Sequence, residues 1–339
     1  MDRFHTDQWV LQGRRIFESE VQRQFEDYFG GGDGQAYFLG HYTGESAAAS
    51  IVDKQRLKLN HLRFQRDEEE HAAAFQIVLD QLRVQTELAD NKYQQLLILT
   101  LANLGPLKSA DAFVLSCFAA KLAKESKDYI DLFDNLSFWE SYAKSSSGVC
   151  LVFDFQHLQQ CFLRAGLYNM AFGHVIYEAD AFASFVREQI VSTLNNYEGE
   201  LADGSAALTG NSEWYHANAL ANSLNTACFF YKRPQFKPES EYRFVVLSAD
   251  PMLIDTGDAE TRIPHLWLPI NCRKEEASCS DWRERIRPMP ILCTIMGPVA
   301  DPRGAKSEIF SLKLRRAGYV SDVLQIRTSE LRLRGSGGC

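Results

Sequence analysis

The amino-acid sequence predicts an α+β fold, built from a mixed β-sheet with helical insertions. Apolar, β-rich runs and segments of helical periodicity interleave irregularly, without the regular alternation that builds a doubly wound parallel sheet. No GxGxxG or GxxxxGKS/T motif follows a strand-like run, which argues against nucleotide-binding folds of those types. With 45% hydrophobic and 24% charged residues, the 339-residue chain has enough apolar material for a core without metals or disulfides.

Three regions are expected along the chain. Residues 1–34 form an N-terminal helix, from about Trp9 to Tyr28, followed by a glycine linker, Gly30–Gly34. Residues 35–334 form a single domain, and residues 335–339 form a flexible tail. The linker precedes a strand rather than a helix, so it does not have the context of a phosphate-binding loop.

Within the domain, β-branched and aromatic runs predict the strands, and spacings of three and four residues predict the helices. Strands are expected at 36–42, 56–59, 112–118, 149–155, 174–177, 241–247, 265–270, 291–296 and 320–326. Helical segments are expected after Thr43, which can cap a helix with Glu45 in its first turn, and at 67–104, 137–144, 180–195, 213–228 and 306–317.

Charge and cysteine usage restrict the classes of function. The formal net charge of -8 argues against a broadly basic nucleic-acid surface, but it leaves room for a local one, such as Arg283–Arg287 or the basic residues between Lys313 and Arg334. The eight cysteines form no CxxC pair and no zinc-ligand spacing, so we expect buried free thiols in a reducing cytoplasm and no metal. We expect neither a signal peptide nor a membrane span.

His41 is a candidate ligand-contacting residue because it lies where a strand ends and a helix begins. Alternation along the strand places Tyr37, Leu39, His41 and Thr43 on one face, and Phe38, Gly40 and Tyr42 on the other. A lone histidine is more often structural, so both interpretations remain open.

The second candidate lies at the start of the strand 241–247. Alternation places Glu239, Glu241 and Arg243 on one face of that strand, with apolar side chains opposite. One interpretation is a solvated edge with a weak glutamate–arginine pair. The other is a pair of carboxylates converging on a pocket, one of them steered by Arg243.

Aromatic residues form a third candidate. Trp139 and Tyr142 lie shortly before Gly148, where they can wall a flat ring, although aromatic side chains more often anchor a core. Cys117 and Cys228 lack any local signature of a nucleophile, which argues against a thiol enzyme.

Taken in order from about Ala36 to Arg332, these segments resemble the bacterial domain-of-unknown-function family twenty-nine seventy-one. The motifs that carry the resemblance are the His-Tyr-Thr strand Phe38–Thr43, Arg56–Leu59, Asp67 and Glu70, Val114–Phe118, Trp139-x-x-Tyr142 leading to Gly148–Phe153, Lys232–Phe236, Glu239–Arg243, Ile291–Gly297 and Ile326–Arg332. That family is in turn similar to the ADP-ribosyltransferase fold, which implies a mixed, split β-sheet of that type.

The resemblance implies an NAD-dependent ADP-ribosyltransferase, a cytoplasmic toxin or antiphage defence effector that uses NAD as a substrate. Its acceptor is a protein or a nucleic acid, and no membrane is involved. Glu241 would stabilise an oxocarbenium-like transition state, and Glu239 would orient or deprotonate the acceptor. The residues implied in NAD binding are His41, Tyr42, Thr43, Trp139, Tyr142 and Arg243.

Two alternatives remain open at this point. The same site can act as an NAD glycohydrolase, which would consume NAD without modifying a target. The fold can also serve as a non-catalytic module that senses a nucleotide or binds a protein, since fold alone does not establish activity.

Overall fold

The structure of the protein is a computed structural model, and it describes residues 35–61, 68–104, 112–123, 128–143, 147–155, 158, 170–203, 211–247, 254–255, 264–269, 272–273, 286–287, 291–298, 305–319 and 325–331. The helix and linker expected over 1–34 and the tail expected over 335–339 lie outside these residues. The class is mixed α+β with an open mixed sheet, as the sequence predicts.

The contacts divide the chain into two compact units, each discontinuous in sequence. Described residues of unit 1 fall within His61–Ala112 and Ala171–Ser248, and those of unit 2 fall within Gly32–Asn60, Phe113–Met170 and Ala249–Cys339. The region 35–334, which we expected to be one domain, is therefore described below unit by unit.

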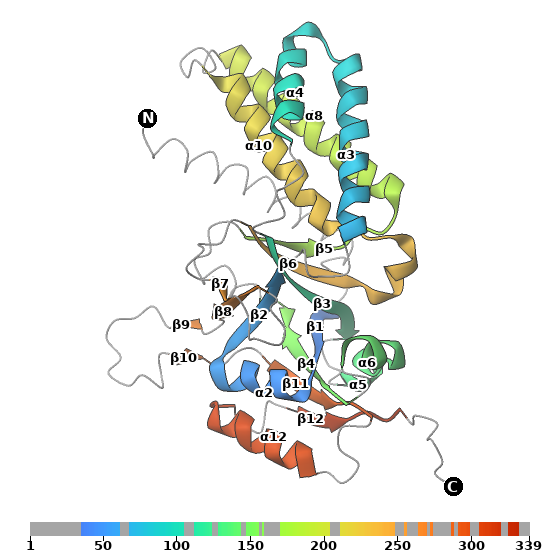
Figure 1. Ribbon diagram of the computed structural model, residues 1–339, viewed down its shortest axis with the longest axis vertical. Helices are drawn as coiled ribbons and strands as arrows, with labels where there is room; N and C mark the ends of the chain where they lie inside the picture. The colour runs from blue at the N-terminus through green and yellow to red at the C-terminus, as the bar shows by residue number, and fades with distance from the viewer. Residues whose placement is uncertain are drawn as a thin grey trace. The chain divides into compact units, whose positions relative to one another are not determined.

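Unit 2 contains a mixed sheet (Figure 1) in the order β12-β11-β4-β1-β3-β2-β8-β7. These strands are β1 (Gln35–Thr43), β2 (Arg56–His61), β3 (Ala112–Ala123), β4 (Val149–Asp154), β7 (Ile254–Asp255), β8 (His265–Pro269), β11 (Ile291–Met296) and β12 (Gln325–Thr328). The pair β11 and β12 is parallel, whereas β1 is antiparallel to both β3 and β4. A separate two-stranded ladder joins β9 (Cys272–Arg273) to β10 (Ile286–Arg287).

An aromatic cluster covers one face of β1 and β4. Tyr42 packs edge-on against Trp139 of α6 (Leu136–Tyr142), with ring centroids 4.9 Å apart, and Phe133 of α5 (Ile130–Phe133) joins the same cluster. Gly40 lies so close to the Phe133 ring that any Cβ at this position would collide with it. Burial of these rings is the main stabilising contribution on this face of the sheet.

Two helices complete unit 2. The first, α2 (Glu45–Lys54), buries Ala48, Ala49, Ile51 and Val52. Its N-cap is Gly44 without a side-chain hydrogen bond, so the predicted cap at Thr43 is wrong. Thr43 is still the last residue of β1, paired with Val149 of β4, and this keeps it one residue short of the cap. The second, α12 (Ala305–Arg316), connects the parallel strands β11 and β12.

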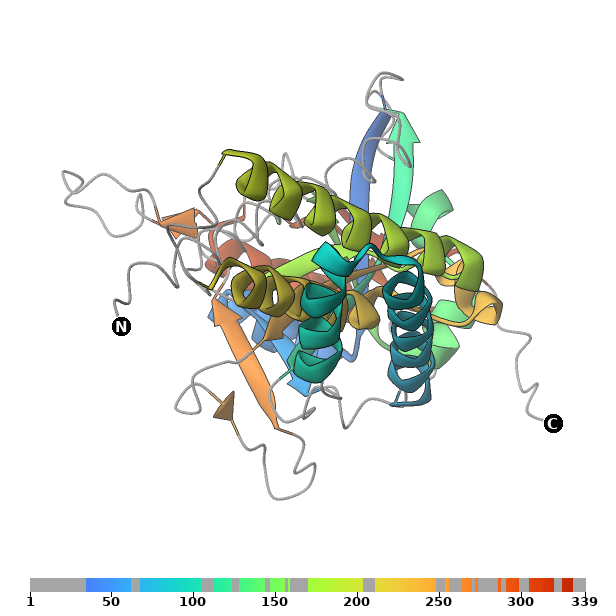
Figure 2. The same ribbon diagram turned by 90° about the horizontal axis from the view of Figure 1, so that it is seen from above.

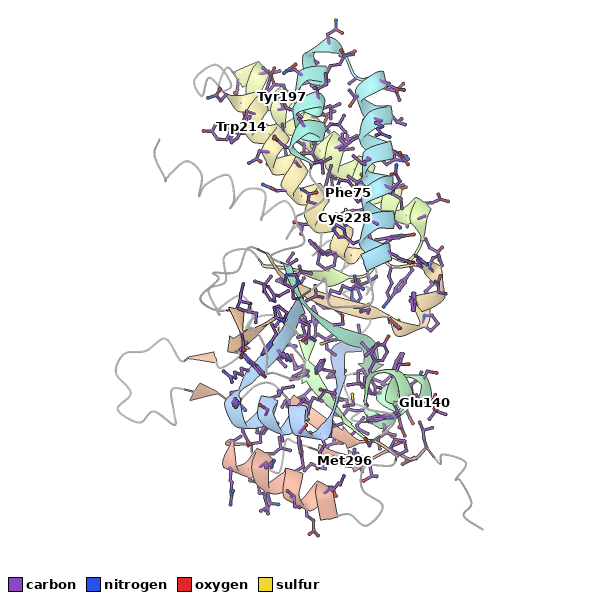
Figure 3. The ribbon with its side chains drawn as sticks, in the orientation of Figure 1. Phe75, Glu140, Tyr197, Trp214, Cys228 and Met296 are labelled. Carbon is purple, nitrogen blue, oxygen red and sulfur yellow. The ribbon has the colours of Figure 1, made fainter. Side chains whose placement is uncertain are left out.

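Unit 1 is built around four helices that lie side by side in both views (Figures 1 and 2): α3 (Glu68–Leu88), α4 (Asn91–Asn103), α8 (Ala179–Asp203) and α10 (Ser212–Ala227). Their core is apolar and includes Val78, Leu82 and Leu97, and Figure 3 labels Tyr197 and Cys228 of the same core. The helical segment expected over 67–104 is two helices, because the chain breaks at Ala89 and Asp90 to form a hairpin.

Unit 1 also contains the pair of strands β5 (Met170–His174) and β6 (Glu241–Leu247). Strand β6 has the bounds predicted for it, but β5 ends where the predicted strand 174–177 was expected to begin. The difference has a physical reason. Past His174, Ile176 instead forms an isolated parallel bridge with Tyr231.

Burial of free thiols is confirmed for Cys117, Cys150, Cys228 and Cys293. Burial raises the pKa of the Cys228 and Cys293 thiols to about 12, which keeps them protonated at neutral pH. Among the described helices, none has the length and apolar composition that crossing a bilayer requires. The described residues contain no group of three or more His, Cys, Asp or Glu side chains arranged to hold a metal ion.

Candidate functional site

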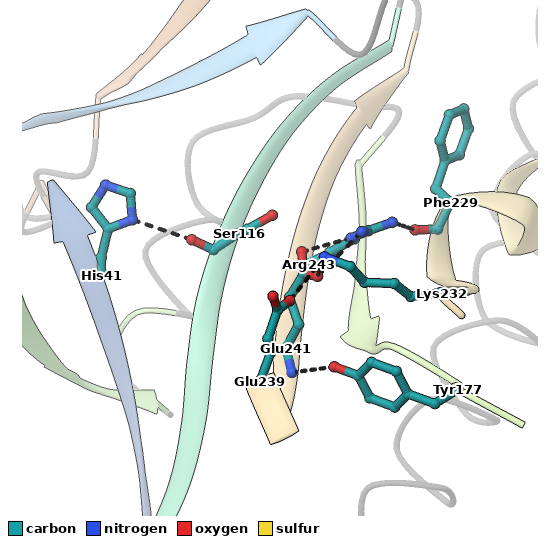
Figure 4. A network of polar contacts seen from close by, with 8 residues as sticks. All are labelled: His41, Ser116, Tyr177, Phe229, Lys232, Glu239, Glu241 and Arg243. Atoms are coloured by element: carbon teal, nitrogen blue, oxygen red, sulfur yellow. Dashed lines mark hydrogen bonds and ion pairs between the residues drawn. The ribbon is translucent and has the colours of Figure 1, made fainter. Parts of the chain in front are cut away.

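Four charged side chains meet at the start of β6 and form a buried cluster, here called the ion quartet: Lys232, Glu239, Glu241 and Arg243 (Figure 4). The Lys232 ammonium lies 2.8 Å from Glu239 Oε2 and 3.2 Å from Glu241 Oε2. Arg243 Nε donates to Glu241 Oε1 at 2.7 Å, and its Nη2 donates to Oε2 at 3.2 Å. Glu241 is therefore held by two cations, one of which it shares with Glu239.

Backbone hydrogen bonds from three chain segments position this quartet. The amide of Val175 donates to the carbonyl of Glu241, and the amide of Lys232 donates to the carbonyl of Ile176. The segment after β5 therefore bonds both to the strand that carries Glu241 and to the segment that carries Lys232. Tyr177, from that same segment, accepts the Glu241 amide hydrogen on its hydroxyl oxygen at 2.7 Å.

Glu239 does not lie on the strand. It is the last residue of the short 3-10 helix η4 (Pro234–Glu239), and Ser240 follows with φ 44°, in the left-handed region. The predicted strand alternation from Glu239 to Arg243 is therefore wrong at its first residue. The tight turn at Ser240 nevertheless brings Glu239 and Glu241 to one ammonium, and a non-glycine residue in this region costs on the order of 1 kcal/mol.

The quartet is removed from solvent, which excludes the interpretation of a solvated edge. The side chains of Glu241 and Arg243 are 3% and 4% exposed, and those of Lys232 and Glu239 are 7% and 12% exposed. Burial alone would lower the pKa of Lys232, but the charge of Glu241 and the hydrogen bond to Glu239 outweigh it, and the net effect raises the pKa. Two acids and two bases in mutual contact keep the cluster close to neutral, as buried charges require.

Arg243 also supports the backbone. Its Nη1 donates to the carbonyl of Phe229 at 2.7 Å, next to the 3-10 helix η3 (Cys228–Phe230) that follows α10. The Lys232 ammonium lies 4.6 Å from the centroid of the Phe236 ring, a cation–π contact within η4. Both cations thus bridge the carboxylates to neighbouring segments of unit 1.

His41 belongs to unit 2, whereas the quartet belongs to unit 1. His41 is partly buried near the end of β1, and its Nδ1 lies 3.2 Å from the carbonyl oxygen of Ser116 on β3 (Figure 4). Burial lowers the pKa of the imidazole, and the Ser116 carbonyl opposes that effect in part. With a neutral ring, Nδ1–H donates to this carbonyl and Nε2 is an acceptor.

The other predicted NAD contacts in unit 2 differ in exposure. Trp139 is fully buried, and its indole N–H donates to Asp134 Oδ1 at 2.7 Å. Tyr142 is 39% exposed. Tyr42 is a core residue whose hydroxyl donates to the carbonyl of Phe133, and burial raises its pKa. Thr43 is partly buried at the end of β1. Of the two aromatic residues predicted to stack on a ligand ring, Tyr142 is the one with exposed surface.

Lys232 and Tyr177 complete the candidate site, and sequence reasoning assigned neither of them a role. Lys232 precedes Arg233 and a proline, a context typical of a loop, and nothing in its spacing to Glu239 indicates a shared contact. A signal was nevertheless present. Two glutamates two residues apart, inside an apolar strand context, need compensating cations, and Lys232 was the nearest lysine or arginine in sequence after Arg243, Lys237 and Arg233.

Comparison with known proteins gives one family match. Residues 138–244 match the model of the family described as "Protein of unknown function (DUF2971)", the family that the motif order resembles. No curated protein and no solved structure matches the chain. The matched segment runs from α6 to β6 and includes Trp139, Tyr142 and all four residues of the ion quartet. Residues 138–244 are thus similar to a family of unknown function, and the candidate site at the start of β6 lies within the similar segment.

Proposed function

We propose that the protein cleaves NAD at its nicotinamide–ribose bond and transfers ADP-ribose to a macromolecular acceptor, with an ADP-ribosyltransferase type of fold. The observation that supports this function is the pair of glutamates at the start of β6, one on each side of Ser240, that share the Lys232 ammonium. The reaction class is proposed from the resemblance in motif order, and the carboxylates of the ion quartet are proposed as the reacting groups.

The reaction needs an anion beside a developing cation. As the bond from ribose C1′ to the nicotinamide nitrogen breaks, its electron pair leaves with nicotinamide and positive charge develops on the ribose. A carboxylate that is ionised and desolvated in advance stabilises this transition state more than the ground state. Arg243 and Lys232 favour the ionised form of Glu241 despite its burial. The acceptor then bonds to C1′ and gives up its proton to Glu239.

The NAD contacts in unit 2 are proposed from the resemblance. His41 presents Nε2 as an acceptor for a ribose hydroxyl or the carboxamide when Ser116 holds its Nδ1. Tyr142 is proposed to stack on the nicotinamide ring, because Trp139 has no exposed surface. Tyr42 and Thr43 would contribute to NAD binding indirectly, through the shape and the backbone of β1.

A second candidate function is a non-catalytic module that binds a nucleotide or a protein. The observation that favours it is the 3% exposure of the Glu241 side chain and its engagement by both cations. In such a module the cluster would have a structural role and would hold β6 to the segment after β5.

Incubation of purified protein with NAD labelled in its adenylate half tests the proposal. We expect release of nicotinamide and transfer of label to protein or nucleic acid in a cell extract. Release without transfer would identify an NAD glycohydrolase. Neither release nor transfer would overturn both NAD-consuming functions, and a rise in melting temperature with NAD under those conditions would identify the sensing module.

A further inference from the structure

A cationic and aromatic surface lies on unit 2, on strands that the proposed chemistry does not use. Strand β2 alternates between partly exposed and buried residues, with Leu57, Leu59 and His61 turned inward. Arg56 and Lys58 therefore share the outward face. Strand β8 pairs with β2 so that Lys58 lies directly opposite Trp267, which is partly exposed on the same face.

The side chains of this surface are in contact. The Arg56 guanidinium lies over the Trp267 ring, 4.3 Å from its centroid, and the Lys54 ammonium lies 5.8 Å from the same centroid. Lys54 ends α2, and Gln55, in the left-handed conformation, turns the chain directly into β2. Lys54 and Arg56 thus lie over one indole, and Lys58 lies opposite it across the β2–β8 ladder. These residues are here called the β2–β8 patch: Lys54, Arg56, Lys58 and Trp267.

The cations of the patch are not neutralised within the described part of the chain. No carboxylate there forms an ion pair with Lys54, Arg56 or Lys58, in contrast to Lys232 in the ion quartet. Arg56 Nε is buried and has no acceptor among those residues. Asp255 of β7 is the acidic neighbour of Trp267, and it accepts the indole N–H at 3.3 Å and lies 3.4 Å from His265 Nε2.

We propose that the β2–β8 patch binds single-stranded nucleic acid. Cations beside a partly exposed aromatic side chain match the two repeating chemical groups of such a strand, the anionic phosphate and the flat base. Arg56 and Lys58 are spaced by about 6.6 Å along the strand, so each reaches a different phosphate. Trp267 and the guanidinium that lies over it offer a flat surface for an unpaired base.

A single strand fits this surface better than a duplex does. The bases of a duplex present only their edges, so they cannot stack on a flat protein surface. An unpaired base exposes its whole face and can stack on it. The net charge of -8 does not oppose local binding, because screening confines the effective field to about 8 Å at physiological ionic strength. The α12 end, with Lys313, Arg315 and Arg316, is a second basic surface, and α12 carries no aromatic side chain exposed beside these cations.

The proposal goes beyond the NAD reaction and does not depend on it. A nucleic-acid surface on unit 2 is compatible with a transferase and with a non-catalytic module. Binding is therefore measured without NAD, so a failure of binding and a failure of NAD cleavage are separate results.

The test is equilibrium binding of the full chain to fluorescently labelled oligothymidylate and oligouridylate of about twenty nucleotides, longer than one expected site. A DNA duplex of equal length and vesicles containing phosphatidylserine serve as competing arms. The variants are Trp267→Ala and Lys58→Ala. Trp214→Ala, which removes a half-exposed tryptophan from α10, and Arg315→Ala, which removes a cation from α12, are the matched controls.

We expect the single strands to bind in preference to the duplex. Trp267→Ala should weaken binding about fivefold or more, from the loss of one stacked base. Lys58→Ala should reduce the slope of log affinity against log salt by about 0.7, from the loss of one phosphate contact. Both controls should leave affinity unchanged, and a preference between the two oligonucleotides would identify DNA or RNA as the target.

Four results would overturn the proposal: absence of single-strand binding by the folded wild-type protein, equal binding of the duplex, binding to vesicles alone, or loss of binding in Arg315→Ala with both patch variants unaffected. Lys58→Ala changes a partly exposed side chain without a described ion pair, so it keeps the test valid even where Trp267→Ala lowers stability.

Discussion

Replacement of Lys232 by methionine is the most informative test of the ion quartet. The ammonium contacts both carboxylates, at 2.8 Å and 3.2 Å, and is almost fully buried. Methionine fills similar volume without the charge, which leaves two buried glutamates with one guanidinium. Loss of one partner from a buried ionic cluster costs about 3–5 kcal/mol, most of it from the uncompensated charge that remains.

Chemical denaturation of wild type and Lys232→Met measures this cost as the change in the unfolding free energy. The matched control is Lys237→Met, five residues away in η4, where an ion pair of 3.0 Å to Glu178 has both side chains more than half exposed. Exposed pairs contribute little to stability, so the control should change far less. Equal changes in the two variants would refute the view of the quartet as a desolvated, interdependent cluster.

The same variant has a pH signature whose sign follows from linkage. The folded-state pKa of Lys232 is raised above the ordinary value of 10.5, because the two glutamates outweigh burial. Stabilisation by this group is therefore complete below pH 10.5 and is lost as the pH rises through the higher folded value. The stability difference between wild type and Lys232→Met should shrink at strongly alkaline pH. A difference that grows there would contradict the assignment.

Two further predictions concern packing and histidine burial. Gly148→Ala should lower the free energy of unfolding, measured in denaturant, by about 1–3 kcal/mol or more, because a Cβ there would overlap the carbonyl oxygens of Thr43 and Ala143. Gly199→Ala, in an open position of α8, should instead raise the free energy of unfolding by about 0.5–1 kcal/mol. If Gly199→Ala were the more destabilising of the two, that result would contradict the packing described for β1 and β4. Burial lowers the pKa of His174 from 6.5 to about 3, so the folded state takes up its proton later than the unfolded state and stability should fall as the pH drops from 6.5 towards 3. The variant His174→Phe should flatten that part of the pH–stability curve, and an unchanged slope would show that His174 is not buried as a neutral ring.

Much of the secondary structure could be predicted from local pattern. Strand β6 has its predicted bounds because Tyr242, Phe244 and Val246 form a buried apolar face, and β11 because it is a mostly apolar run in which every residue except Leu292 is buried. The predicted bounds are wrong where a residue pairs in an isolated bridge beyond the end of a strand, as at Ile176, or where a two-residue break divides a long helical pattern, as at Ala89 and Asp90. Neither feature changes the spacing of apolar residues on which the prediction of helices and strands is based.

The candidate site could be located but not built from the sequence. Glu239, Glu241 and Arg243 were found from their charge in an apolar context, yet alternation assumed a strand through Glu239. Pro234 and Pro238 favour the 3-10 helix found there, and the turn at Ser240 aims both carboxylates at Lys232. That contact depends on the hydrogen bonds from the Lys232 amide to the Ile176 carbonyl and from the Val175 amide to the Glu241 carbonyl, which join residues far apart in sequence and leave no periodic pattern.

The aromatic residues show the same limit. The sequence placed Trp139 and Tyr142 together beside Gly148, and both do lie on α6. Which of them faces the core depends on the helix phase against β1, where Tyr42 packs on Trp139. Tyr142, three residues later, is left with the exposed surface that a ligand ring needs.

The rate of nicotinamide release from NAD by Glu241→Gln tests the central proposal most directly. Glutamine keeps the shape of the side chain and can still accept from Arg243, but it removes the negative charge that the developing cation needs. For variant protein with a native unfolding transition, we predict a release rate at least about a hundredfold below that of wild type. Release at the wild-type rate would contradict the role assigned to Glu241.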